Sequence, residues 1–269
     1  MDRKIISKER KSYLRKLRLN KFLVIFTQVL ILVAFIASWE ILANIGVIDS
    51  FIMSQPSEIV KTFVSMLSEG LMEHIWITCK ETLIGFTLGT VLGTAIATIL
   101  WWSPFISKVL SPYLVVLNSL PKVALGPIII VWVGAGMSAI ITMALAISLV
   151  VTILEMLNGF SSTDENTIKM AKTFGANKLQ IFTKIVFPSN VPNLINAFKV
   201  NIGLCMVGVI TGEFLVSKGG LGHLIVYGGQ VFKLDLVMTS VIILAIVASI
   251  MYESILLICN LVSKSKKWR

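Results

Sequence analysis

Long apolar runs alternate with short polar segments along the chain. Six of these runs are close to the roughly 20 residues that an α-helix needs to cross a hydrocarbon core of about 30 Å. We expect the six spans at residues 22–45, 76–102, 113–133, 138–157, 194–216 and 236–262. The hydropathy pattern therefore predicts an all-α, polytopic membrane protein with six transmembrane helices.

The spans divide the chain into a few parts. The first apolar run is longer than the usual core of a signal peptide and no A-x-A-like site follows it, so we interpret it as a retained helix. The expected parts are a basic arm (1–21), a first transmembrane helix (22–45), a mixed segment with an amphipathic helix at 57–67 (46–73), a five-helix core (74–262) and a basic tail (263–269). Within the core we expect a short connection at 103–112, a tight turn at 134–136 and a glycine-rich loop at 217–235.

One polar segment, residues 161–192 in a loop spanning 159–192, separates two very apolar spans and carries four lysines. Ser162 and Glu165 have the S-x-x-E spacing of a capping box, which predicts the start of a short helix. Gly175 suits the left-handed position just past the end of that helix. The first half of the segment is therefore expected to be a capped helix followed by a tight turn.

A second short helix is expected after this turn. Asn177 and Gln180 have the spacing of another capping box at its start. Pro188 is expected to stop this helix, and Pro192 fits the first turn of the next span. The whole segment therefore predicts a helical hairpin that stays outside the membrane.

Composition and charge placement strengthen the membrane interpretation. Of the 269 residues, 56% are hydrophobic and 14% are charged, whereas a soluble domain has about 25% charged residues. Of the 24 Lys and Arg residues, 18 fall on the side shared by the termini and the hairpin, three on the opposite side and three within spans. This bias places both termini and the hairpin in the cytoplasm, and segment 46–73 outside the cell membrane. The net charge of +10 is then explained without a nucleic-acid partner. Either the basic residues only set the topology, or the basic arm also contacts anionic lipid of the bilayer.

The sequence has none of the motifs of common catalytic or nucleotide-binding sites. It contains no G-x-x-x-x-G-K-[ST] loop, no CxxC, no HExxH and no G-x-S-x-G. Cys79, Cys205 and Cys259 occur singly in or beside apolar runs, which favours small apolar residues over a disulfide or a metal site. His74 and His223 are expected as solvated or interfacial residues rather than ligands. We therefore expect no catalytic residue, cofactor or metal.

The second span carries a G-x-x-x-G-x-x-x-G series formed by Gly85, Gly89 and Gly93. Glycines at this spacing leave one helix face bare, so a neighbouring helix can approach closely. The series either packs inside the bundle or forms a sliding contact between elements that move during transport.

The third span holds the candidate pathway residues Pro121, Lys122, Gly126 and Pro127. Prolines free backbone carbonyls at membrane depth, which is tolerated only where protein or a water-filled cavity satisfies them. Lys122 is costly against lipid, so it either attracts an anion in a pathway or is held by snorkelling or pairing as a packing device. We add Glu213, near the outer end of the fifth span, to these candidates.

The hairpin sequence KMAKTFGANKLQIFTKIVFPSNVP resembles the cytoplasmic loop of binding-protein-dependent ABC importer permeases, whose pattern is E-A-A, three residues, Gly, then I-x-L-P. Gly175 matches the glycine, Ala171 matches the second alanine, and Pro188 closes the I-x-L-P motif. Three positions depart from the pattern, because Lys169 replaces the glutamate, Met170 the first alanine and Phe187 the leucine. The resemblance implies an ATPase-coupling loop that includes Lys169, Ala171, Gly175, Ala176, Asn177 and Pro188.

Three further stretches, 85–93, 117–136 and 211–225, are similar to the nitrate/sulfonate/taurine branch of these permeases. The resemblance implies a type I permease fold and a non-catalytic subunit that works as a pair, as a homodimer. It also implies a cytoplasmic ATP-binding subunit that hydrolyses ATP and an extracytoplasmic substrate-binding protein. The implied solute is an alkanesulfonate, taurine or nitrate, and the alternative is a thiamine precursor or another heterocycle. A stand-alone secondary transporter and a non-transporting scaffold are the other classes we consider.

Overall fold

The structure is a computed structural model that describes residues 8–265, with side chains described for residues 13–259. Within this range the chain is helical and contains no strand. The longer elements are α1 (Lys8–Asn44), α3 (Pro56–Ser68), α4 (Leu71–Trp102), α5 (Pro104–Ser119), α6 (Gly126–Val133), α7 (Met137–Ser161), α11 (Val191–Val216), α12 (Leu221–Gln230) and α13 (Leu234–Ser265). The short ones are α2 (Ser50–Met53), η1 (Lys122–Leu125), α8 (Glu165–Thr173), α9 (Lys178–Ile181), η2 (Phe182–Val186) and α10 (Phe187–Ser189).

Five helices are long and apolar enough to cross a membrane, and a bent pair would make a sixth span. The five are α1, α4, α7, α11 and α13, each close to an expected span. The bent pair corresponds to the third expected span, 113–133, with its prolines at 121 and 127. It consists of α5 followed by η1 and α6, with a bend of 89° between the two halves. The all-α architecture with five or six spans is thus the one that the hydropathy pattern predicts.

The expected short connection at 103–112 is wrong, because these residues belong to α5. Ser103 caps the helix by accepting a hydrogen bond from the Ile106 backbone N–H (3.4 Å), and Pro104 occupies its first turn. Pro112 lies inside the helix without ending it. The break comes at Leu120, which is extended (φ −65°, ψ 141°) because Pro121 follows it.

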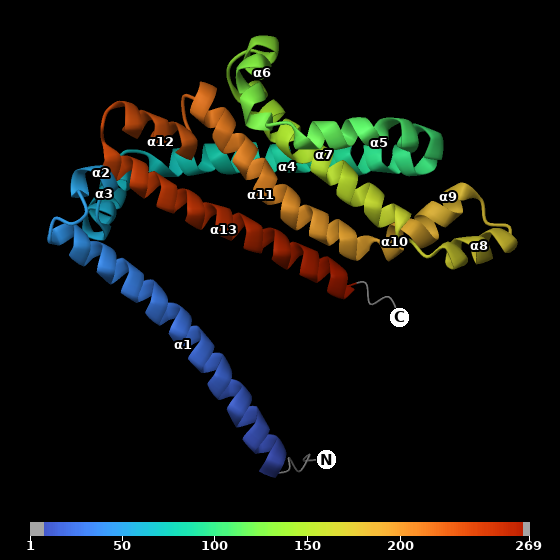
Figure 1. Ribbon diagram of the computed structural model, residues 1–269, viewed down its shortest axis with the longest axis horizontal. Helices are drawn as coiled ribbons and strands as arrows, with labels where there is room; N and C mark the ends of the chain where they lie inside the picture. The colour runs from blue at the N-terminus through green and yellow to red at the C-terminus, as the bar shows by residue number, and fades with distance from the viewer. Residues whose placement is uncertain (1–7, 266–269) are drawn as a thin grey trace.

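The basic arm is not separate from the first span, because α1 is one continuous helix from Lys8. The helix extends away from the rest of the molecule, as Figure 1 shows, and it is joined to α3 where the Ser57 backbone N–H donates to Glu40 Oε2 (3.1 Å). The tail expected at 263–269 begins inside α13, and its residues 266–269 lie outside the described range, as do residues 1–7 of the arm.

The centre of the molecule is formed by α4, α7 and α11, which lie side by side (Figure 1). The glycine series of α4 faces α7: a Cβ on Gly85 or Gly89 would lie 2.9 Å from Ala144 or Ser148, and one on Gly93 would lie 2.7 Å from a methyl of Thr152. Since real Cβ contacts are longer than this, the missing side chains set the spacing of the two helices.

The glycine-rich segment expected as a loop at 217–235 contains a ten-residue helix, α12. The segment turns at Gly220, whose φ of +101° favours glycine, and the helix begins at the next residue. The amphipathic helix expected at 57–67 is present as α3, and its buried Ile59 and Met66 lie on the side of α13. The turn expected at 134–136 is also present, with φ of +86° at Gly134 and +117° at Gly136. Of these elements, α3 and α12 lie at the end of the bundle opposite α8–α10, whereas α6 projects from one side of the bundle (Figure 1).

Candidate functional site

The polar segment forms the predicted helical hairpin of α8 and α9 at one end of the bundle (Figure 1). Its first cap differs from the expected one. Asp164, and not Ser162, caps α8 by accepting from the backbone N–H groups of Asn166 (3.3 Å) and Thr167 (2.9 Å). A carboxylate satisfies two N–H groups and favours the positive helix end, whereas the Ser162 hydroxyl is used on the Gly159 carbonyl (2.8 Å). The hydrogen bond from the Thr167 hydroxyl, followed by the two backbone bonds, lowers the pKa of Asp164.

The turn and the second cap are as predicted. Gly175 has a φ of +81°, the left-handed conformation expected there. Asn177 Oδ1 accepts from the Gln180 backbone N–H (2.8 Å), and Gln180 Oε1 accepts from the Asn177 backbone N–H (2.9 Å). Both halves of the capping box are therefore made, and they fix the direction in which α9 leaves the turn.

Pro188 does not stop the second helix, so this prediction is wrong. The chain passes from α9 through the π-helix η2 into α10, and Pro188 sits in the first turn of α10. The Phe187 N–H bonds to the carbonyl five residues back, at Phe182, and this wider turn accommodates the proline ring. The helical path ends at Asn190 instead, just before Pro192 enters the first turn of α11 as predicted.

Asn190 ties the two ends of the hairpin together. Its side-chain amide donates to the Val186 carbonyl (2.8 Å) and to the Thr163 hydroxyl (2.8 Å), and its side-chain oxygen accepts from the Asn193 amide (2.8 Å). The residue is 3% exposed. One buried amide therefore joins the entrance of α8 to the exit of α10.

An aromatic cluster attaches the hairpin to the ends of α4 and α7. The Phe182 ring centroid lies 5.1 Å from that of Trp101, 5.4 Å from Phe160 and 6.0 Å from Phe187. Each such pair contributes about 0.5–1.5 kcal/mol beyond its buried area. This cluster cannot be predicted from the sequence, because its members are spread over residues 101–187 and no local spacing links them.

Lys178, at the start of α9, binds the same end of α4. Its ammonium donates to the Trp102 carbonyl (2.5 Å) and lies 5.6 Å from the Trp102 ring centroid and 6.0 Å from that of Trp101. A cation is favourable at a helix C-terminus and over an aromatic face. The hairpin is thus attached to α4 by both aromatic packing and a charged group.

The hairpin also presents apolar side chains outward. Met170, Phe174 and Leu179 are 57%, 82% and 59% exposed, although they belong to a polar segment. Ala171 points inward and is 9% exposed in the core with Ile181. Of the residues expected to contact an ATPase, Ala171 therefore packs within the hairpin, whereas its neighbour Met170 faces out.

The other residues expected to couple to the ATPase are either exposed on the surface of the hairpin or used within its structure. Lys169 is exposed and pairs with Glu165 one turn earlier (3.1 Å), so both side chains lie on the surface of α8. Ala176 is partly buried against the hairpin core. Asn177 caps α9, and Pro188 lies in the first turn of α10. The exposed apolar surface is therefore the part of the hairpin most suited to a protein partner.

The candidate pathway residues of the third span lie at its bend. Pro121 precedes η1, and Lys122 donates to Asn118 Oδ1 (3.2 Å) and to the Ile147 carbonyl of α7 (3.4 Å). Gly126 is buried and Pro127 occupies the first turn of α6. Lys122 thus braces the bend against the middle of α7, which agrees with the packing alternative for this residue.

Glu213 lies apart from these residues, under the start of α12. It is 1% exposed; Oε1 accepts from the Thr78 hydroxyl (2.6 Å) and Oε2 from the Gly222 backbone N–H (2.6 Å). Thr78 in turn accepts from the Leu221 N–H (2.8 Å). The carboxylate therefore caps α12 and joins it to α4 and α11, and its burial inside the chain argues for a structural role rather than a pathway one.

The two histidines lie beside this cap. His74 Nδ1 accepts from the Gly220 backbone N–H (3.0 Å), and the His74 and His223 rings stack at 6.3 Å between centroids. His74 is therefore partly buried in the cap rather than simply solvated. Within the described part of the chain, no group of three His, Cys, Asp or Glu side chains is placed to hold a metal ion.

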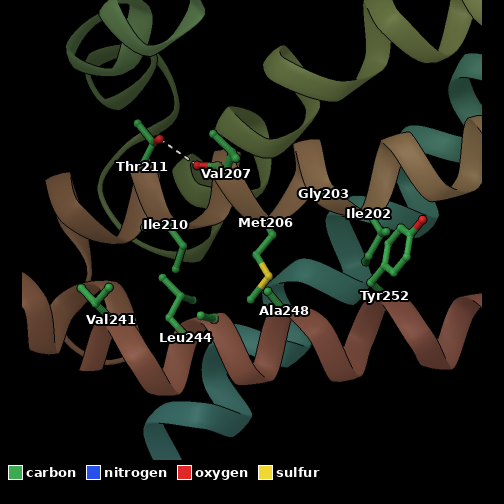
Figure 2. A pocket seen from close by; sticks show the side chains of 11 residues that line it. Ile202, Gly203, Met206, Val207, Ile210, Thr211, Val241, Leu244, Ala248 and Tyr252 are labelled. Carbon is green, nitrogen blue, oxygen red and sulfur yellow. Dashed lines mark hydrogen bonds between the residues drawn. The ribbon is translucent and has the colours of Figure 1, made fainter. Parts of the chain in front are cut away.

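An apolar groove of about 440 Å³ lies between α11 and α13. Met206, Ile210 and Leu244 point into it from the two helices (Figure 2). The hydroxyl of Thr211 is already used on the Val207 carbonyl (2.7 Å). A lining of this kind suits an acyl chain or a helix face rather than a small polar solute.

The membrane helices, the broken third span and the helical hairpin agree with a membrane component of a transport system. The chain belongs to the family described as binding-protein-dependent transport system inner membrane component, which matches residues 86–267. It is an ABC importer permease by family, and this membership confirms the resemblance seen in the hairpin.

Similar proteins from several bacteria are also transport permeases. An ABC transporter permease of Haemophilus influenzae is 28% identical over 240 residues, covering 89% of this chain and 95% of that one. An aliphatic sulfonates transport permease, SsuC, of Bacillus subtilis is 28% identical over 236 residues, covering 87% and 84%. A formylaminopyrimidine transport permease, ThiX, of Halalkalibacterium halodurans is 26% identical over 186 residues, covering 69% and 74%.

Solved structures support the fold. The MetNI methionine ABC transporter in an inward facing conformation matches with a TM-score of 0.64 at 19% identity, covering 73% of this chain and 97% of that one. The described helices therefore have the arrangement of an ABC importer permease of the MetNI type.

Proposed function

We propose that the chain is the permease subunit of an ATP-driven importer in which the hairpin α8–α9 docks on a separate cytoplasmic ATP-binding subunit. The observation that carries this proposal is the exposed surface of Met170, Phe174 and Leu179 on a hairpin that is firmly attached to α4 and α7. Movement of a partner bound to that surface would be passed directly to two membrane helices.

The orientation and the remaining partners follow from the same proposal. Both termini and the hairpin face the cytoplasm, as the lysine and arginine bias indicates. Two copies of the chain form the translocation pathway, and an extracytoplasmic binding protein delivers the solute at the α12 end. Family membership supports these partners in general terms.

The proposed solute is an alkanesulfonate, taurine or nitrate, and the similarity to SsuC supports the sulfonate in particular. The similarity to ThiX supports a second candidate, a thiamine precursor, carried by the same kind of importer. Thermal shift of the cognate binding protein with an alkanesulfonate and with a formylaminopyrimidine would separate the two. Stabilisation by only one of them assigns the solute class.

Substitution of the exposed hairpin surface tests the docking proposal. Phe174→Asp places a charge where an apolar contact is proposed, and loss of such a contact costs about 2 kcal/mol or more, roughly a 30-fold weaker complex. The matched control is Phe105→Asp, since Phe105 is 77% exposed but lies outside the hairpin. Co-purification of the ATP-binding subunit should fail for Phe174→Asp alone. Equal recovery with both variants would refute docking through this surface.

A further inference from the structure

Two buried carboxyl groups meet at the α12 end of the bundle. Glu81 of α4 is 5% exposed and Glu213 of α11 is 1% exposed. Thr78, one turn before Glu81 on the same face of α4, donates to Glu213, so Glu81 is directed at the same part of α11. The Glu81 and Glu213 side chains are hydrogen-bonded to one another. Because an ionised carboxylate only accepts hydrogen bonds, this bond requires a proton on one of the two groups.

The surroundings assign this proton to Glu81. Glu213 already accepts from the Thr78 hydroxyl and from the Gly222 backbone N–H, both at 2.6 Å, and such bonds favour an ionised carboxylate. Glu81 Oε2, by contrast, meets no donor among the described residues. No cationic side chain in the described part of the chain lies within 4.0 Å of Glu81 either. A second buried carboxylate is costly here, whereas a neutral Glu81 can donate to Glu213.

The shared proton affects α12, because Glu213 caps that helix. The start of α12 lies directly on the carboxyl group: a Cβ on Gly222 would be 2.7 Å from Glu213 Oε2. Ionisation of Glu81 would place a second negative charge against Glu213 at this contact. If α12 moves away, both carboxyl groups reach water, where glutamates are ionised at neutral pH. Release of α12 at neutral pH therefore also releases one proton.

Other titratable or charged groups surround the pair. They are His74, Cys79 and Lys80 of α4, Lys218 before α12, and His223 of α12. Helices α7 and α13 pack here through apolar side chains such as Ile140 and Ile243. His74 Nδ1 accepts from the Gly220 N–H, so its protonation would loosen α12 in acid rather than in base. The two lysines are exposed and stay cationic well above neutral pH, which leaves the Cys79 thiol as the group in this set that ionises in the same direction.

We propose that Glu81 and Glu213 hold one proton between them and form a pH-sensitive switch that keeps α12 in place. The proton holds α12 against α4 and α11, and raising the pH releases the helix. The inference rests on the proposed function only for the statement that this end faces the outside, where external pH would act on it. The switch itself requires neither the ATP-binding subunit nor the hairpin, so failed docking in Phe174→Asp has no bearing on it.

Hydrogen exchange of α12 tests the switch in the full-length permease in lipid nanodiscs. Since each release of α12 sets one proton free, protection of α12 should fall about tenfold per pH unit above neutrality, after correction for the intrinsic pH dependence of exchange. Helix α8, at the opposite end of the bundle, should keep constant protection over this range. Constant protection of α12 would overturn the proposal.

Variants assign the pH dependence to the carboxyl pair. Glu81→Gln still offers a donor to Glu213 but cannot titrate, so protection of α12 should become independent of pH. Glu73→Gln, on an exposed residue of the same helix, and Cys79→Ser should both keep the fall seen in the wild type. A fall that survives in Glu81→Gln, or that disappears in Cys79→Ser, contradicts the assignment.

A second measurement needs no substitution, in case Glu81→Gln does not fold. Infrared spectra of the wild-type permease in nanodiscs should contain the C=O stretching band of a protonated carboxyl group at neutral pH. This band should weaken as the pH rises, over the same range in which α12 loses protection. Absence of such a band at neutral pH would show that the pair holds no proton and would overturn the proposal.

Discussion

At the hairpin end, α4 finishes in Trp101 and Trp102, which pack against Phe182 and Lys178 of the hairpin. Toward the other end, α4 supplies Thr78, which with Glu213 of α11 caps the start of α12. The first attachment combines this aromatic packing with a buried apolar core that includes Leu100, Phe160 and Ile181, and apolar contacts of this kind are not directional. The second is a set of short hydrogen bonds to a buried carboxylate, which holds only in one geometry. We infer that the α12 end is the fixed part of the bundle and the hairpin end is the part that receives motion.

The largest effect expected from this comparison is at the buried carboxylate. Glu213→Gln replaces a charge-assisted acceptor with an amide that cannot accept from both Thr78 and Gly222, so the free energy of unfolding should fall by about 2–3 kcal/mol. Glu73→Gln, on the exposed face of α4, is the matched control. Thermal unfolding in detergent measures both, and equal melting temperatures would remove the basis for calling this end fixed.

A smaller loss is expected at the amide that joins the two ends of the hairpin. Asn190→Ala removes the hydrogen bonds to Val186 and Thr163 and leaves a buried carbonyl less satisfied, at a cost of about 1–2 kcal/mol. The effect should be local, so hydrogen exchange should rise in residues 163–190 and stay unchanged at α12. A rise spread evenly over both ends would show that the ends are not separate units.

Gly175→Ala tests the turn of the hairpin. An alanine at a φ of +81° is strained, and the substitution should cost about 1 kcal/mol. Gly229→Ala is the control, because Gly229 is helical and a Cβ there would meet nothing within 4 Å. Limited proteolysis of the hairpin should be faster only in Gly175→Ala, and a similar rate in both variants would contradict the role of the turn.

The smallest effect concerns the cap of α8. The hydrogen bonds from Thr167 and Asn166 depress the folded-state pKa of Asp164 below its ordinary value of 3.8, so the ionised cap favours the folded helix at any pH above that value. This contribution is lost as the pH falls below about 3.8 through the lowered pKa. Hydrogen exchange of α8 should increase in that acid range in the wild type. Asp164→Asn, which caps without titrating, should show no such step.

Local patterns in the sequence predict the hairpin well. Gly175, the Asn177–Gln180 box and the entry of Pro192 depend on neighbours within a few residues, and all three are present. The predicted first cap lies two residues too early, because Asp164 competes with Ser162 and offers two acceptor oxygens. The predicted stop at Pro188 is wrong, because a π-helix can accommodate a proline that would end an ordinary helix.

Contacts between distant segments could not be predicted in this way. The prolines mark the place where the third span breaks, but no local spacing reveals the 89° angle or the contact of Lys122 with the Ile147 carbonyl. The aromatic cluster joins residues more than 80 positions apart, from Trp101 to Phe187. The structural role of Glu213 is likewise not visible in the sequence, because its hydrogen-bond partners, Thr78 and Gly222, belong to two other elements.

The central claim is that the attachment of the hairpin to α4 transmits the movement of the ATP-binding subunit. Lys178→Met keeps the aliphatic stem but removes the ammonium from the Trp102 carbonyl and from both tryptophan rings. In proteoliposomes with the binding protein and the ATP-binding subunit, we measure solute imported per ATP hydrolysed. We predict normal assembly and continued hydrolysis, with uptake per ATP reduced roughly tenfold by loss of a contact of about 1–2 kcal/mol. An unchanged ratio in this variant would contradict the account.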